Sequence, residues 1–195
     1  MKLKFGIFGG TFNPIHIGHL LVAEYVLTQF LLDKIIFVPT YIPPHKKNWE
    51  IVSPEHRCNM IKIALKNNKN FVFSDFEIKQ KTKSYTVYTL ENFYNKKHKL
   101  FLLIGDEWLK KFNTWHRYEE IFKISDLIVI RRIRNGEKIP KFLTKYKNKI
   151  HFSNNPIIEI SSSMIRERLS KNLSVKYMIP EKVLKYIQKE KLYGK

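Results

Sequence analysis

Short apolar segments alternate along the chain with longer segments in which apolar and polar residues are mixed. The apolar segments, which we expect to be buried strands, are 3–8, 34–38, 71–75, 100–104, 127–130 and 157–160. The mixed segments, which we expect to be helices, are 18–32, one that starts at Ser53-Pro54, 87–94, 163–169 and 181–189. This alternation predicts an α/β fold around a mostly parallel sheet, in one domain over residues 1–195 with a small C-terminal helical portion from about 161.

The end of the first predicted strand carries the clearest candidate chemistry. The segment 9–19 reads Gly-Gly-Thr-Phe-Asn-Pro-Ile-His-Ile-Gly-His, and glycines let a backbone approach a ligand closely. His16 and His19 are three apart where a helix begins, so both can face one side of its first turn. A helix N-terminus suits a phosphate chain. The alternatives are two ordinary buried histidines or half of a metal site, but no carboxylate or cysteine stands beside the pair. Phosphate handling is therefore favoured.

Composition excludes several classes of protein. Of the 195 residues, 44% are hydrophobic and 14% aromatic, which excludes a disordered basic tail. No apolar stretch approaches the ~18 residues that a membrane helix needs, and the first residues lack the pattern of a signal peptide. The single cysteine, Cys58, cannot form an internal disulfide. We expect a cytoplasmic protein without a membrane partner.

The formal charge of +19 is concentrated near the C-terminus, where residues 131–195 hold 17 basic and 5 acidic side chains. The densest part is 131–149, which could be a patch for nucleic acid or a solvated lysine-rich surface. A nucleic-acid module should interleave stacking aromatics with its basic residues. This run holds only Phe142 and Tyr146, so we expect no nucleic-acid partner.

A second motif stands near the C-terminus and carries a family resemblance together with the first. His16-Ile17-Gly18-His19 resembles the His-x-Gly-His signature of the nucleotidyltransferase superfamily, and Ile160-Ser-Ser-Ser-Met-Ile-Arg166 matches its second element, Ile-Ser-Ser-x-x-Ile-Arg. Serines that open a helix cap it and leave hydroxyls and amides for phosphate, and Arg166 supplies a fork of donors. The resemblance implies a Rossmann-like, doubly wound sheet.

Three segments in the middle of the chain resemble the bacterial nicotinate mononucleotide adenylyltransferases. They are Pro-His-Lys at 44–46, Ser-Tyr-Thr-x-x-Thr-Leu at 84–90, and Ile-Gly followed by acidic residues and a tryptophan at 104–115. The resemblance implies that His45 and Lys46 contact the mononucleotide. It also implies that Thr86 lies at the substituent of the pyridine ring and that Trp115 stacks on that ring.

The same resemblance implies a site for ATP. His16 and His19 would contact its phosphates, Arg166 would help to hold the β and γ phosphates, and Mg²⁺ would bind mainly through the phosphates. The other residues expected at ATP are Gly9, Gly10, Thr11, Phe12, Gly18, Gly105, Asp106, Glu107, Ile160, Ser161 and Ser162. Glu107 occupies the position of the family's aspartate and Asp106 the variable one, so either carboxylate could make the acidic contact.

Some questions stay open at the level of sequence. Asn13 could order its turn or contact the mononucleotide. Arg131-Arg132-Ile133 departs from the family's Arg-Pro-Gly, which leaves the contacts of that loop undefined. Preference for the acid or the amide form of the mononucleotide is also undefined. Phosphopantetheine adenylyltransferases share both terminal motifs but lack the segments at 44–46 and 84–86, and class I aminoacyl-tRNA synthetases need a Lys-Met-Ser-Lys-Ser loop that is absent.

Overall fold

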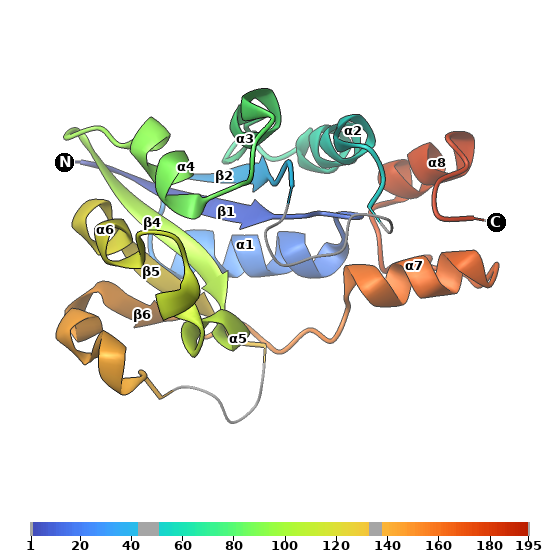
Figure 1. Ribbon diagram of the computed structural model, residues 1–195. Coiled ribbons are helices and arrows are strands. Elements are labelled where there is room, and N and C mark those ends of the chain that lie inside the picture. Colours follow the sequence, from blue (N-terminus) through green and yellow to red (C-terminus); the bar gives the residue numbers. More distant parts are fainter. Residues whose placement is uncertain (1, 43–50, 133–137, 195) are drawn as a thin grey trace.

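The computed structural model describes residues 2–42, 51–132 and 138–194, and within them six strands form one sheet with helices on both faces (Figure 1). The strands are β1 Leu3–Gly10, β2 Lys34–Pro39, β3 Phe71–Phe73, β4 His98–Gly105, β5 Ser125–Ile130 and β6 Ile150–Phe152. Their order is β3-β2-β1-β4-β5-β6, and all neighbours pair in parallel. The predicted Rossmann-like α/β fold is confirmed.

The strand order places a switch point between β1 and β4. From β1 the chain adds β2 and β3 on one side, and it then returns to add β4, β5 and β6 on the other. Connections that leave in opposite directions open a crevice beyond the carboxyl ends of the two central strands. Gly10 and Gly105 are the last residues of those strands, so the sequence motifs that follow them meet at this crevice.

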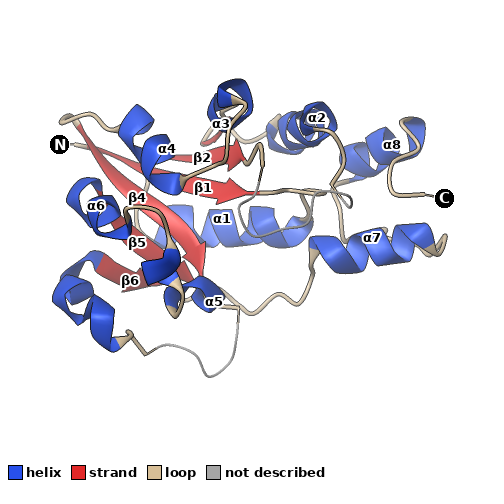
Figure 2. Cartoon of the chain, viewed as in Figure 1, coloured by secondary structure: helices blue, strands red, loops and turns tan. Residues whose placement is uncertain are grey.

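Two apolar clusters lie on the two faces of the sheet, and Figure 2 shows helices on either side of the strands. Alternate residues of β2 show the division, because Ile35 and Phe37 belong to one cluster and Ile36 and Val38 to the other. The helices are α1 Ile17–Gln29, α2 Pro54–Leu65, α3 Phe76–Gln80, α4 Thr86–Phe93, α5 Asp106–Leu109, α6 Tyr118–Ile124, α7 Ser162–Ser170 and α8 Glu181–Lys189, with 3₁₀ helices η2 Phe112–Thr114 and η3 Lys141–Lys149. Helices α1, α2 and α8 contribute to the first cluster, and α4 and α6 contribute to the second.

One predicted strand is wrong. Residues 157–160 have no regular structure, and the last strand of the sheet is instead β6. Ile158 and Ile160 are apolar because they pack against the core cluster and not because they pair in the sheet. The strand β6 has only three residues, of which Ile150 alone is buried, so it is too short to show a pattern.

The predicted helix boundaries agree with the structure more closely than the predicted strand at 157–160 does. Helix α8 has the predicted bounds, whereas α1 ends three residues before the predicted Leu32. Helix α2 begins as predicted, because the Ser53 hydroxyl accepts a hydrogen bond from the His56 amide at 3.3 Å.

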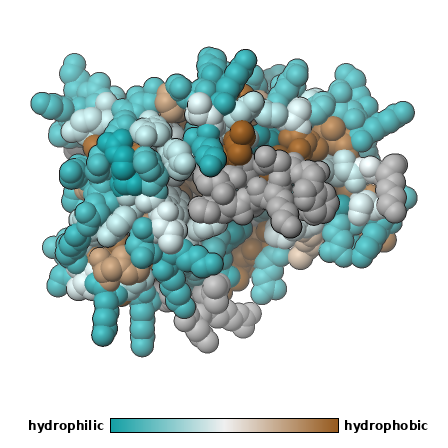
Figure 3. Space-filling view, viewed as in Figure 1, coloured by the Kyte–Doolittle hydropathy of each residue, from teal (hydrophilic) through white to brown (hydrophobic). Residues whose placement is uncertain are grey.

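Hydrophilic residues predominate on the face of the molecule that Figure 3 shows. No helix in the described part of the chain is long and apolar enough to cross a membrane. Part of the basic run 131–149 holds η3 against α6: Lys145 Nζ lies 2.5 Å from a Glu119 carboxylate oxygen, and Lys149 donates to the Phe122 carbonyl. These two lysines therefore have structural partners.

Candidate active site

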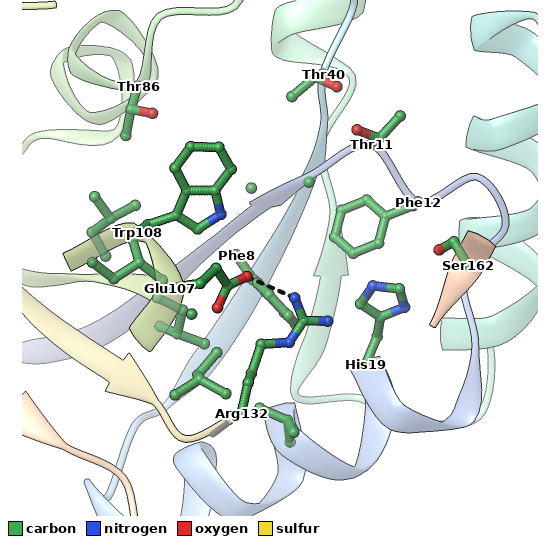
Figure 4. Close-up of a pocket in the computed structure, with 18 of the residues that line it drawn as sticks. Phe8, Thr11, Phe12, His19, Thr40, Thr86, Glu107, Trp108, Arg132 and Ser162 are labelled. Atoms are coloured by element: carbon green, nitrogen blue, oxygen red, sulfur yellow. Dashed lines mark hydrogen bonds and ion pairs between the residues drawn. The ribbon is translucent and has the colours of Figure 1, made fainter. Parts of the chain in front are cut away.

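A cavity of about 630 Å³ lies at the crevice beyond β1 and β4 (Figure 4), within the size range of ligand sites. Most of the predicted site residues line it: Gly9, Gly10, Thr11, Phe12, Asn13, His16, Gly18, His19, Thr86, Gly105, Glu107, Trp115, Ile160, Ser161 and Ser162. Asp106 and Arg166 are not among the residues that line it. His45 and Lys46 lie outside the described residues.

His19 is fixed in one tautomer by the turn that starts α1. Its Nδ1 accepts a hydrogen bond from the backbone amide of His16 at 3.2 Å. Since Nδ1 acts as the acceptor, the neutral ring carries its proton on Nε2. His19 thus presents an N–H donor on the far side of its ring, which suits it to an anionic oxygen.

His16 is almost fully buried and stacks on His19, with ring centroids 3.6 Å apart and planes at 29°. Burial, helped by the positive charge of Arg132, lowers the pKa of His16 to about 3. The ring is therefore neutral at pH 7. A Cβ at Gly18 would lie 3.1 Å from this ring, which explains a glycine between the two histidines.

The depressed pKa of His16 predicts a pH dependence of stability. In the unfolded chain the ring takes its proton near pH 6.5, and in the folded chain only near pH 3. Stability should therefore fall as the pH drops from 6.5 towards 3, by about 2 kcal/mol at pH 5, and should not change through this group above 6.5. Urea unfolding of the wild type and of His16→Gln at pH 7 and pH 5 measures this, and equal losses in both proteins would contradict it.

The first residues of α7, a helix near the C-terminal end of the chain, also line the cavity. The Ser161 hydroxyl accepts from the Met164 amide at 3.1 Å, so it caps the helix as predicted and keeps its own O–H to donate. The Ser162 hydroxyl donates to the Pro14 carbonyl at 2.9 Å. Arg166 donates to the Asn13 carbonyl at 3.0 Å. Ser162 and Arg166 thus fasten α7 to the loop between β1 and α1.

The two acidic residues after β4 have separate places. Asp106 is buried, and its Oδ2 accepts from the backbone amide of Arg132 at 3.1 Å. Glu107 lines the cavity and pairs with the Arg132 guanidinium at 2.7 Å. In Figure 4 the Arg132 guanidinium lies between the Glu107 carboxylate and the His19 ring. Of the two carboxylates, Glu107 is therefore the one that lines the cavity.

The other end of the cavity is aromatic. Trp115 packs on Phe112 with ring centroids 5.0 Å apart and lies edge-on to Trp108. Its Nε1 is buried without a hydrogen-bond partner among the described residues. Thr86 is the first residue of α4 and lines the same end. A flat aromatic wall beside a helix N-terminus suits a planar ring with an anionic substituent.

Sequence reasoning missed Arg57, which orders the walls of the cavity. Its fully buried guanidinium donates to the backbone carbonyls of Thr11 at 3.0 Å and Thr40 at 2.7 Å. It therefore joins the loops that follow β1 and β2. The available signal was its spacing, three and four residues before the buried Met60 and Ile61, which places a charged residue on the apolar face of α2.

Two other cavity residues were also missed, Arg132 and Glu77. The buried Glu77 accepts from the Thr89 hydroxyl at 2.5 Å, and burial raises the pKa of its carboxyl group. It is one residue in a polar segment, and nothing in the local pattern marks it as buried.

The described residues contain no group of three or more histidine, cysteine, aspartate or glutamate side chains that could hold a metal ion. This donor set does not fit a metal ion held by protein ligands alone. It is compatible with a metal ion that arrives on the phosphates of a nucleotide.

A parallel sheet with a cavity at its switch point, bordered by a glycine-rich strand end and two helix N-termini, defines the class of Rossmann-like nucleotide-binding proteins. The model of the cytidylyltransferase-like family matches residues 7–168, and the chain belongs to this family. Full-length relatives include two probable nicotinate-nucleotide adenylyltransferases. The one from Caldicellulosiruptor saccharolyticus is 42% identical, and the match covers 98% of this chain and 99% of the relative. The one from a Thermoanaerobacter species is 38% identical, and the match covers 100% of this chain and 96% of the relative.

Solved structures share the fold of this chain. The nicotinic acid mononucleotide adenylyltransferase of Plasmodium falciparum complexed with NaAD superposes with a TM-score of 0.78, at 22% identity and with 98% of this chain and 97% of that chain covered. The same enzyme complexed with APC gives a TM-score of 0.77. These similarities show a shared fold over the whole chain.

Proposed function

We propose that the protein transfers the adenylyl group of ATP to nicotinate mononucleotide, giving nicotinate adenine dinucleotide and pyrophosphate. One observation carries the proposal: a single cavity joins phosphate-binding groups at His16, His19 and Ser161 to an aromatic end at Thr86 and Trp115. The full-length relatives named for this activity support it.

The phosphate-binding groups would act on ATP. A 5′-phosphate oxygen of the mononucleotide forms a bond to the α-phosphorus, and the bond from that phosphorus to the bridging oxygen breaks, so pyrophosphate leaves with the electron pair. The attacking oxygen is already anionic and needs no general base. Catalysis then consists of alignment and of stabilising the charge that grows on pyrophosphate. His19 Nε2–H and the Ser161 O–H are the donors proposed for that charge.

Gly9 is proposed as the point of closest approach between backbone and nucleotide. A Cβ added there would meet no atom of the described chain within 4 Å, so packing within the protein does not require a glycine. A ligand that lies against the backbone at this position would require it.

The aromatic end would hold the mononucleotide, with the pyridine ring against Trp115 and its carboxylate at the amides of α4 beside Thr86. His45 and Lys46, which lie outside the described residues, are proposed to contact the 5′-phosphate of the mononucleotide. Glu107 is proposed as the acidic contact of the nucleotide site, because it lines the cavity and the neighbouring Asp106 does not.

Mg²⁺ is proposed to enter bound to the phosphates of ATP, where it would neutralise part of their charge. The proposed setting is the cytoplasm, which agrees with the buried free thiol of Cys58.

The proposal predicts which substrate releases pyrophosphate. The purified protein with ATP and Mg²⁺ should release pyrophosphate with nicotinate mononucleotide, more slowly with the amide form, and not with phosphopantetheine. Omission of Mg²⁺ should abolish release in each case. A preference for phosphopantetheine, or no release with either mononucleotide, would refute the proposed function.

A further inference from the structure

The side chain of Asn13 connects the loop between β1 and α1 to two distant parts of the chain. Its Oδ1 accepts a hydrogen bond from the hydroxyl of Tyr193 at 2.8 Å and from the amide of Val52 at 3.3 Å. Asn13 is 3% exposed, so these bonds are shielded from water. The turn that precedes both histidines is thereby attached to the last residues of the described chain.

Asn13 also connects to α7 through its backbone. Its carbonyl accepts from the Arg166 guanidinium at 3.0 Å, and the neighbouring Pro14 carbonyl accepts from the Ser162 hydroxyl. A shift of Asn13 would therefore move the loop that carries His16 and also the start of α7. Both elements border the phosphate end of the cavity.

The last residues are folded so that they deliver Tyr193 to this place. After α8 the chain turns back, with the Leu192 amide donating to the Ile187 carbonyl at 3.0 Å. Lys191 and Tyr193 have φ values of 51° and 63°, a left-handed conformation that costs a non-glycine residue about 1 kcal/mol. Surrounding contacts must stabilise this conformation, and the bond to Asn13 is one of them.

The phenol of Tyr193 is suited to act as a donor. Burial raises its pKa, although the positive charges of Arg166 and Arg57 act in the opposite direction. The group therefore keeps its proton over the working pH range and can donate to Asn13.

We infer that Tyr193 is a positioning residue for adenylyl transfer, which holds Asn13 so that the two histidines and the start of α7 keep their alignment on the triphosphate. This inference rests on the proposed function. It assigns to the C-terminal segment a part in the reaction. Misalignment of reacting groups lowers the rate of transfer more than it weakens ground-state binding, so loss of the Tyr193 hydroxyl should affect kcat more than KM.

The test compares Tyr193→Phe with Tyr186→Phe, a matched control. The Tyr186 hydroxyl is hydrogen-bonded to His56 Nδ1 at 2.9 Å and to Asn59 at 3.1 Å, and it is absent from the contacts of Asn13. Each variant loses one phenolic hydroxyl and keeps the ring. Tyr193→Phe should lower kcat for pyrophosphate release by ~10-fold with KM for ATP within twofold, while Tyr186→Phe should leave both constants near wild type. Equal effects of the two variants on kcat would overturn the inference.

A second measurement does not depend on turnover. NMR titration of the His16 ring should give a pKa near 3 in the wild type and in Tyr186→Phe. In Tyr193→Phe the value should rise towards 6.5, because a loosened loop admits water to the ring. An unchanged His16 titration in Tyr193→Phe would overturn the inference. If the wild type released no pyrophosphate, the proposed function would fail, and the His16 titration would decide this inference by itself.

Discussion

Replacement of His19 by alanine should lower kcat for adenylyl transfer by about 10²–10³-fold and leave the fold intact. The reason is geometric, because His19 Nδ1 accepts from the His16 amide, which leaves Nε2–H as the donor that we propose for the leaving pyrophosphate. The loss of one donor aimed at developing negative charge typically costs this much in turnover. Steady-state pyrophosphate release, with ATP and mononucleotide at saturation, measures the effect.

The control for this prediction is His98→Ala. His98 is the first residue of β4, at the end of the strand opposite to Gly105 and the cavity. This variant should keep kcat within about twofold of the wild type. Thermal unfolding checks that the His19→Ala variant is folded. A folded variant with the turnover of the wild type would eliminate His19 from the mechanism.

Replacement of Arg57 by methionine should lower the free energy of unfolding by about 2–6 kcal/mol, which is the cost of leaving two buried carbonyls without a donor. Methionine fills part of the space but donates no hydrogen bond, so the carbonyls of Thr11 and Thr40 would be left buried without their donor. The carboxyl group of Glu77 would also lose a nearby positive charge that lowers its pKa. Urea unfolding followed by circular dichroism measures the loss.

The matched control is Lys66→Met, which removes the same charge from an exposed position at the end of the same helix. A change of at most about 0.5 kcal/mol is expected there. If Arg57→Met were as stable as Lys66→Met, the bonds from Arg57 to the two loops would contribute nothing net to stability.

Sequence predicted those parts of the site in which residues a few positions apart form a recognisable pattern. His16 and His19 lie one turn apart, and Ser161 caps the helix that it precedes, so spacing of three residues is enough to find both. The parallel sheet follows from apolar segments that alternate with helices, and the position of the cavity follows from glycines at two strand ends. The wrong strand at 157–160 shows the limit, because burial of Ile158 and Ile160 by packing resembles burial by pairing.

What the sequence determined by itself was therefore the class of fold, the two motifs at strand–helix junctions and most of the residues that border one cavity. Tertiary structure decided which of those side chains line the cavity and which are bound within the protein. It directs Glu107 to the cavity and Asp106 to the Arg132 amide, and it sets the tautomer of His19. It also brings Tyr193 to Asn13. The physical reason is that helix caps and turns depend on residues a few positions apart, whereas side-chain direction and burial depend on contacts made across the whole chain.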